Sequence, residues 1–137
     1  MNNCENDGAV SNSNDYSRVT GGCVGDLIGS SDIYLCRNTN DVFGSGKVGG
    51  IVGGAYDGEV HLCTNSGNIS GVPSYDDKFC YVGGIAGYSI NSNSVYSCCV
   101  NDGEVQGELA PKDYPYFYYI GAGNPVVMCN GDHSRWE

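Results

Sequence analysis

Cysteine is the residue type in this chain with the most potential for chemistry: it occurs eight times, and Cys98 and Cys99 are adjacent. So many cysteines suit a disulfide framework, a metal site or a buried set of free thiols. The sequence holds no Cys-x-x-Cys pair, so the spacing of a zinc site is missing. We therefore expect a buried row of thiols that pack as small hydrophobic side chains. One or two disulfides among Cys23, Cys80, Cys98 and this row are the alternative.

Histidine and carboxylate side chains give little sign of catalysis. The two histidines are His61 and His133, and neither belongs to a His-Glu-x-x-His motif. His61 lies between two apolar neighbours, so we expect it on the outer, solvated face of a strand. We predict no enzyme activity, no catalytic residue, no metal site and no cofactor. A polysaccharide-acting enzyme would need paired carboxylates on one exposed face, and Asp57, Glu59 and Glu104 are the nearest candidates.

The composition excludes several classes of partner. Lys+Arg is 6 and Asp+Glu is 16 among 137 residues, which gives a net charge of −10. Nucleic acids and anionic membrane surfaces are poor partners for so acidic a chain. The 22 glycines disfavour a helical fold. No apolar run approaches the about 20 residues of a membrane-spanning helix, so we expect no membrane insertion.

Internal repeats organise the whole chain. Segments 48–53 (Val-Gly-Gly-Ile-Val-Gly) and 82–87 (Val-Gly-Gly-Ile-Ala-Gly) match, and each precedes a Cys-x-Asn-x-Gly segment. Weaker copies of both motifs occur on either side. The repeated cysteines are Cys4, Cys36, Cys63, Cys99 and Cys129, at intervals of 32, 27, 36 and 30 residues. Such an irregular period is typical of stacked repeat units.

These repeats predict an all-β fold, because each copy is too small to bury its own apolar face and must stack on its neighbours. We expect an irregular, right-handed parallel β-solenoid of about four coils, with three short strands per coil. The handedness follows from the crossover rule for parallel strands. The side chains expected to point inward are Ile33, Leu35, Val42, Val48, Ile51, Val60, Leu62, Ile69, Val82, Ile85 and Val105.

The chain reads as one repeat domain spanning 1–137. Its first residues already fit the repeat, so we expect it to be a piece of a longer protein. Inserts of unequal length interrupt the repeats at 11–20, 72–81 and 108–119. Residues 130–137, with Trp136, are a candidate cap for the C-terminal end.

The inserts contain the candidate ligand-binding residues. They occupy the same point in each repeat, so stacking would gather them along one edge, where solenoids often bind their partners. Tyrosine suits both sugar rings and protein surfaces; the alternative is that these aromatic side chains fold back to cover the coil. The candidates are Tyr75, Asp76, Asp77, Phe79, Tyr114, Tyr116, Phe117 and Tyr118. Asp76 and Asp77 are also a weak candidate site for calcium.

The repeated segments at 48–71 and 82–107 resemble the GLUG repeat, in which Val-Gly-Gly-Ile-Val-Gly is followed by Cys-x-Asn-x-Gly-x-Val-x-Gly. This resemblance covers most of the chain apart from the inserts. It implies a bacterial surface-exposed or secreted module. Such repeats occur in adhesin-like proteins and in the non-catalytic region of immunoglobulin-A-cleaving metallopeptidases.

We therefore expect a non-catalytic module of an extracellular or cell-surface bacterial protein. Its insert loops would bind a host or bacterial surface glycan or protein. One alternative is a structural stalk of a secreted enzyme such as a metallopeptidase. Another is a self-assembling fibre subunit, whose copies or neighbouring repeats join through the open ends of the coil.

Overall fold

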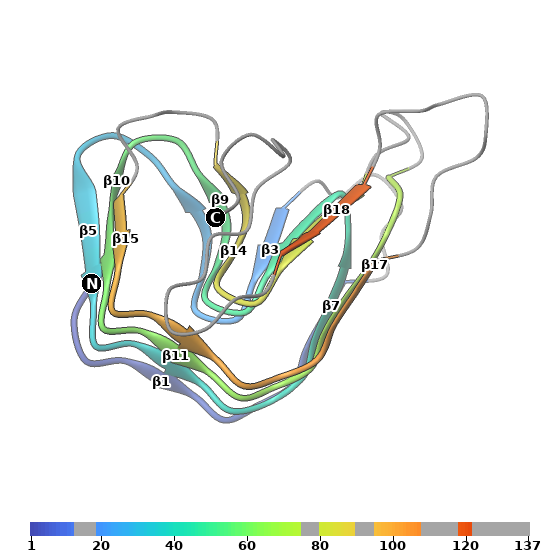
Figure 1. Ribbon diagram of the computed structural model, residues 1–137, viewed down its shortest axis with the longest axis horizontal. Coiled ribbons are helices and arrows are strands. Elements are labelled where there is room, and N and C mark those ends of the chain that lie inside the picture. The colour runs from blue at the N-terminus through green and yellow to red at the C-terminus, as the bar shows by residue number, and fades with distance from the viewer. Residues whose placement is uncertain (13–18, 75–79, 90–94, 108–117, 122–137) are drawn as a thin grey trace.

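The computed structural model describes residues 1–12, 19–74, 80–89, 95–107 and 118–121, which form eighteen short β-strands and no helix. Every pairing between these strands is parallel, and equivalent strands of successive repeats lie side by side (Figure 1). The predicted all-β parallel β-solenoid is confirmed. Within the described residues, nothing helical has the length and apolar character needed to cross a bilayer.

The strands fall into successive coils. A first, incomplete coil holds β1 (Glu5–Asn6) and β2 (Val10–Ser11). The next coil holds β3 (Val19–Gly21), β4 (Val24–Leu27), β5 (Ser31–Tyr34), β6 (Arg37–Asn38) and β7 (Val42–Ser45). The third holds β8 (Lys47–Gly49), β9 (Val52–Ala55), β10 (Gly58–His61), β11 (Thr64–Asn65) and β12 (Ile69–Val72). The fourth holds β13 (Cys80–Gly83), β14 (Ala86–Ser89), β15 (Val95–Ser97), β16 (Val100–Asn101) and β17 (Val105–Gly107), and β18 (Tyr118–Gly121) begins another.

Each complete coil has five strands, which stack into five parallel sheets, so the prediction of three strands per coil is wrong. The Gly-Gly segment is one of the additional corners, because β8 ends at Gly49 and β9 begins at Val52. A further corner between β10 and β11 makes the Cys-x-Asn segment a short strand of its own.

The coils of Figure 1 run counter-clockwise from β5 along the row of β11 to β7, while the later coils lie nearer to the viewer. This sense of winding is right-handed, as the crossover rule predicts. Most of the three predicted inserts and all of the candidate cap at 130–137 lie outside the described residues.

The repeated cysteines occupy equivalent positions, as the sequence predicted. Each of the four in the described part of the chain directly precedes a strand of the β1–β6–β11–β16 sheet, in which Glu5 pairs with Arg37 and Thr64 pairs with Val100. Successive coils are joined at this position by backbone hydrogen bonds. The Arg37 amide donates to the Cys4 carbonyl at 2.8 Å, and the Thr64 amide to the Cys36 carbonyl at 3.0 Å.

An asparagine ladder runs beside the cysteines and consists of Asn6, Asn38, Asn65 and Asn101. The side-chain amides of Asn6, Asn38 and Asn65 each donate to the side-chain oxygen of the asparagine in the next coil, at 2.7 Å in all three steps. Each amide also donates to the backbone carbonyl two residues later, as Asn65 does to Gly67 at 2.8 Å. Asn38 and Asn65 are fully buried, so these bonds satisfy amides that would otherwise be costly in the interior.

At the Gly-Gly corners the wall of the coil bends inward and lies close to the asparagine ladder; we call this narrowing the pinch. In Figure 1 the wall bends inward between the column of β3 and that of β9 and β14. A Cβ placed on Gly50 would lie 2.1 Å from the carbonyl oxygen of Gly84 and 2.5 Å from Cγ of Asn65. A Cβ on Gly84 would lie 2.2 Å from Cγ of Asn101. Only glycine fits between the bend and the opposite wall.

The pinch divides the apolar interior into two clusters. The smaller consists of Val42, Val48, Ile69 and Val82. The larger consists of Leu27, Ile33, Cys36, Ile51, Val52, Ala55, Val60, Cys63, Ile85, Ala86 and Cys99. Among the residues predicted to point inward, Val105 is half-buried and packs against the smaller cluster.

The inward placement of Leu35 and Leu62 is wrong, because these side chains are 52% and 50% exposed. Both residues have positive φ, 55° and 53°, and each lies at the corner immediately before one of the repeated cysteines. A left-handed residue breaks the alternation of a strand, so the cysteine rather than the leucine faces the interior.

Candidate functional site

The residues predicted to bind ligand are not placed by the structure. Seven of the eight, Tyr75, Asp76, Asp77, Phe79, Tyr114, Tyr116 and Phe117, lie outside the described residues. The eighth, Tyr118, begins β18, and its backbone pairs with Cys80 of β13. The role of the insert loops, and calcium at Asp76 and Asp77, therefore stay predictions.

Outward side chains gather instead at the inward bend of the coil, where Lys47, Tyr56, Tyr81 and Tyr88 form a tyrosine–lysine cluster. The Lys47 ammonium donates a hydrogen bond to the Tyr56 hydroxyl at 2.9 Å and lies 4.3 Å from the centroid of the Tyr88 ring. The Tyr81 and Tyr88 ring centroids are 5.0 Å apart, with planes at 51°. The Tyr56 and Tyr88 centroids are 6.2 Å apart. Two rings, Tyr56 and Tyr88, thus contact the Lys47 cation, and the Tyr81 ring packs against Tyr88.

The strand register explains how these residues meet. Lys47 of β8 pairs with Tyr81 of β13, and in both strands the next residue is a buried valine. Alternation therefore turns Lys47 and Tyr81 outward. Tyr88 of β14 pairs with Gly54 of β9, and the residue after Gly54 is the buried Ala55, so Tyr88 faces outward from the adjoining sheet. Because the wall bends inward between these two sheets, their outward side chains converge.

Asp26 lies at the edge of the cluster, on β4. It pairs with Gly54, and a Cβ on Gly54 would lie 2.7 Å from Oδ1 of Asp26 and 3.2 Å from the Tyr56 ring. Both side chains thus lie over the space that the glycine leaves. Partial burial raises the pKa of the Asp26 carboxyl, and the Lys47 ammonium partly offsets that rise. Burial also raises the pKa of the Tyr81 hydroxyl, with a smaller contribution from Tyr88.

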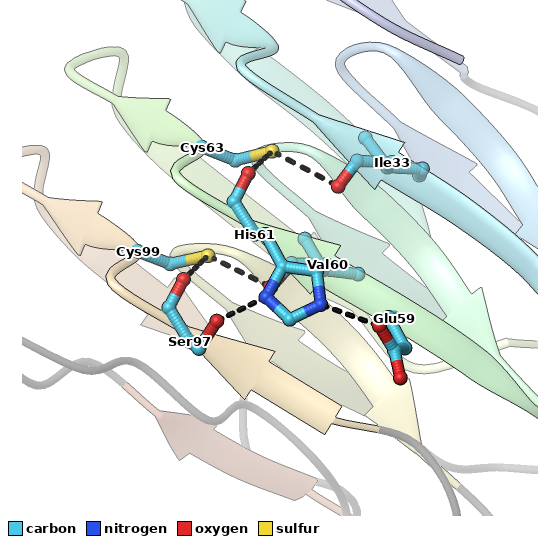
Figure 2. A network of polar contacts seen from close by, with 7 residues as sticks. All are labelled: Ile33, Glu59, Val60, His61, Cys63, Ser97 and Cys99. Carbon is cyan, nitrogen blue, oxygen red and sulfur yellow. Dashed lines mark hydrogen bonds and ion pairs between the residues drawn. The ribbon is translucent and has the colours of Figure 1, made fainter.

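A second group of side chains lies on the outer face of β5, β10 and β15. Figure 2 shows His61 between Glu59 and Ser97: Nε2 lies 2.7 Å from the Glu59 carboxylate, and Nδ1 contacts the Ser97 hydroxyl. Tyr34 stacks on the imidazole, with centroids 4.9 Å apart and planes at 21°. The outer-face position predicted for His61 is confirmed. The solvated state is wrong, because the side chain is 19% exposed and has partners on two coils.

Ser97, His61 and Glu59 have the connectivity of a nucleophile, a base and an acid. With its proton on Nε2, the imidazole donates to Glu59 and accepts from Ser97 through Nδ1. The three side chains are also ordinary neighbours in the outward rows of β10 and β15, because His61 pairs with Ser97 in register. Together with Tyr34, the group links three successive coils, and we interpret it as a clamp between them.

The carboxylates considered for a polysaccharide-acting enzyme are only partly brought together. Asp57 and Glu59 line a hollow of about 280 Å³, together with Ser30, Asp32 and Gly58. Glu104 lies between β16 and β17, at another corner of the coil. Among the described residues, no group of histidine, cysteine, aspartate or glutamate has the arrangement of a metal site.

The six cysteines with described side chains are free thiols. The predicted buried row is confirmed at Cys36, Cys63 and Cys99, whereas Cys4, which begins the row, is exposed. In Figure 2, Sγ of Cys63 approaches the carbonyl of His61 at 3.2 Å, and Sγ of Cys99 approaches that of Val60 at 3.3 Å. Burial raises the pKa of the Cys23 thiol to about 12, helped by the thiols of Cys36 and Cys63. The pKa of Cys63 is raised mainly because its thiol donates to Cys99.

Comparison with protein-family models, with curated proteins and with solved structures finds no match for this chain. The resemblance to the GLUG repeat therefore stays a prediction.

The tyrosine–lysine cluster was missed by sequence reasoning, although a signal for it existed. Lys47 and Tyr81 each stand immediately before a Val-Gly-Gly segment, at the same point of the repeat. Their alternation with the buried valine predicts an outward row. The approach of Tyr56 and Tyr88 carried no such signal, because it depends on the inward bend at the Gly-Gly corner.

Proposed function

We propose that this protein is a non-catalytic repeat module of an extracellular or cell-surface bacterial protein, and that its outer surface binds a glycan or protein ligand. The observation that carries this proposal is the tyrosine–lysine cluster. Three half-buried tyrosines and a lysine gather on the outside of the coil, not in its apolar interior. Tyrosine combines a rigid apolar ring with a polar tip, which makes it a frequent anchor in binding surfaces.

The scaffold supports a binding role as well. Each strand in the middle of the stack is hydrogen-bonded on both sides, and the asparagine ladder fixes the coils in register. Side chains on such a frame are held in place before a ligand arrives, so little ordering entropy is lost on binding. The net charge of −10 disfavours nucleic acids and anionic membranes as the ligand.

An array of immobilised glycans and extracellular matrix proteins tests the proposal. The fluorescently labelled module is expected to bind a restricted set of spots at micromolar concentration, and the unlabelled module should compete for those spots. Absence of competable binding to every spot would contradict a ligand-binding role.

A second candidate function, assembly into a fibre, is favoured by the N-terminal edge of the stack. Within the described residues, β1 to β4 each pair on one side only, whereas residues near the N-terminus bridge to Tyr34 on the outer edge of β5. Exposed strand edges of this kind can pair with another chain. Sedimentation velocity across a hundredfold range of concentration should then reveal growing oligomers. A monomer at every concentration would remove this candidate.

A further inference from the structure

We propose that the tyrosine–lysine cluster, with Asp26 at its edge, is a binding site for an uncharged pyranose unit of a glycan. This inference rests on the proposed binding function and names both the ligand class and the residues.

Tyrosine rings provide the apolar part of the site. Tyr56, Tyr81 and Tyr88 are each half-buried, so part of each residue remains accessible to a ligand. Their planes are tilted by 51° and 56° between neighbours, and the rings therefore form adjoining walls instead of one flat stack. The C–H face of a pyranose packs against such walls in the way that other apolar surfaces do.

Polar groups stand at the margin of these rings. The Lys47 ammonium already donates to the Tyr56 hydroxyl, and the exposed Asp26 carboxylate reaches over Gly54 toward the Tyr56 ring. Sugar hydroxyls are both donors and acceptors, so they can donate to Asp26 and accept from Lys47. Hydrogen bonds to charged groups are stronger than neutral ones and would orient the ring.

The charges favour an uncharged sugar over a polyanion. Among the described residues, the site holds one ammonium, Lys47, and one carboxylate, Asp26, whose charges oppose each other locally, while the whole chain carries −10. In this part of the chain a sulfated or phosphorylated ligand would find a lysine that is already hydrogen-bonded to Tyr56, and repulsion from the acidic chain. A neutral ligand meets neither obstacle.

The site also depends on the bend, because its walls come from two sheets. Lys47 and Tyr81 come from β8 and β13, whereas Tyr88 comes from β14 and Tyr56 directly follows β9. The interior contacts of Gly50 and Gly84 hold this bend. The two sheets that carry the rings are therefore held in position before a ligand binds. This lowers the entropy lost on binding, which matters for a sugar that makes few contacts.

Isothermal titration calorimetry of the full chain tests the inference. The probes are trisaccharides of glucose, mannose, galactose and N-acetylglucosamine, a heparin hexasaccharide as the polyanion, and a proline-rich decapeptide as the protein-like ligand. We expect at least one neutral trisaccharide to bind. Its Kd should rise at least about tenfold in Tyr88→Ala and several-fold in Asp26→Asn.

Tyr34→Ala is the matched control, because it removes an outward tyrosine from a different sheet, and it should leave the Kd unchanged. Asp26 is exposed, so Asp26→Asn keeps the fold even where Tyr88→Ala does not; near-ultraviolet circular dichroism verifies this. Binding of the heparin or peptide probe alone, or sugar binding that Asp26→Asn leaves unaltered, would overturn the inference and leave the proposed function standing. No binding here and none on the array would overturn both.

Discussion

The side-chain amide of Asn38 donates a 2.7 Å hydrogen bond to the side-chain oxygen of Asn65, twenty-seven residues later and one coil further along the stack. Both side chains are fully buried. The repeat places equivalent asparagines above one another in successive coils. Because the interior excludes water, these buried amides must form hydrogen bonds with each other.

Replacing the central member of the ladder should be costly. In Asn65→Ala, Asn38 loses its acceptor and Asn101 loses its donor in a dry interior, so we expect the free energy of unfolding to fall by about 3 kcal/mol. Urea unfolding followed by circular dichroism measures this change. The control is Asn68→Ala, an exposed asparagine whose loss should cost under about 1 kcal/mol. Equal losses in the two variants would show that the ladder has no special role.

The pinch at the Gly-Gly corner gives a second prediction. Gly50→Ala places a Cβ 2.1 Å from the Gly84 carbonyl oxygen, a contact that backbone atoms cannot relieve by a side-chain movement. We expect this variant to lose several degrees of melting temperature or to accumulate in inclusion bodies. Gly25→Ala is the matched control, since nothing lies within 4 Å of the added carbon. A Gly50→Ala protein as stable as Gly25→Ala would refute the pinch.

The residue before each described repeated cysteine has a left-handed backbone conformation, and this predicts a stabilising substitution. Leu62 has φ of 53° and is half exposed, and the equivalent corner before Cys4 holds Asn3, with φ of 55°. Asparagine tolerates this conformation better than leucine, so Leu62→Asn should raise the free energy of unfolding by about 0.5–1 kcal/mol. Thermal and urea unfolding both report it. Destabilisation by Leu62→Asn would mean that the exposed leucine makes contacts that outweigh the strain.

Asp26 links stability to pH. The Asp26 side chain is largely exposed, but partial desolvation raises the pKa of its carboxyl in the folded protein above 3.8, so the folded state favours the protonated carboxyl. The stability that this group contributes is therefore complete below pH 3.8 and is lost as the pH rises through the higher folded-state pKa. Asp26→Asn should raise the melting temperature at pH 7 and lose that advantage near pH 3. A gain that is the same at both pH values would contradict the ionisation argument.

Much of the coil could be predicted from the sequence. The repeated Cys-x-Asn and Val-Gly-Gly segments predicted the parallel stack, and the intervals between cysteines gave the register that the strands adopt. Repetition made this possible, because a position that recurs in every copy must have the same environment in every coil.

The exposed leucines, the buried asparagines and the candidate site depend on backbone conformation, which residue type alone does not predict. Leu35 and Leu62 look like inward residues of a strand, and only their positive φ turns them out. Asparagine is common at corners, so the residue type of Asn38 and Asn65 does not predict their place in the interior. The candidate site was missed for a related reason: Lys47 and Tyr88 meet across a bend whose angle is set by glycine contacts with the opposite wall.

The most direct test of the in-register stack is a set of nuclear Overhauser effects on the isotope-labelled protein. We expect the Asn65 side-chain amide to lie close to both Asn38 and Asn101, and the Thr64 backbone to show the parallel pattern with Arg37 and Val100. An antiparallel pattern at Thr64, or an Asn65 amide in contact with neither asparagine, would contradict it.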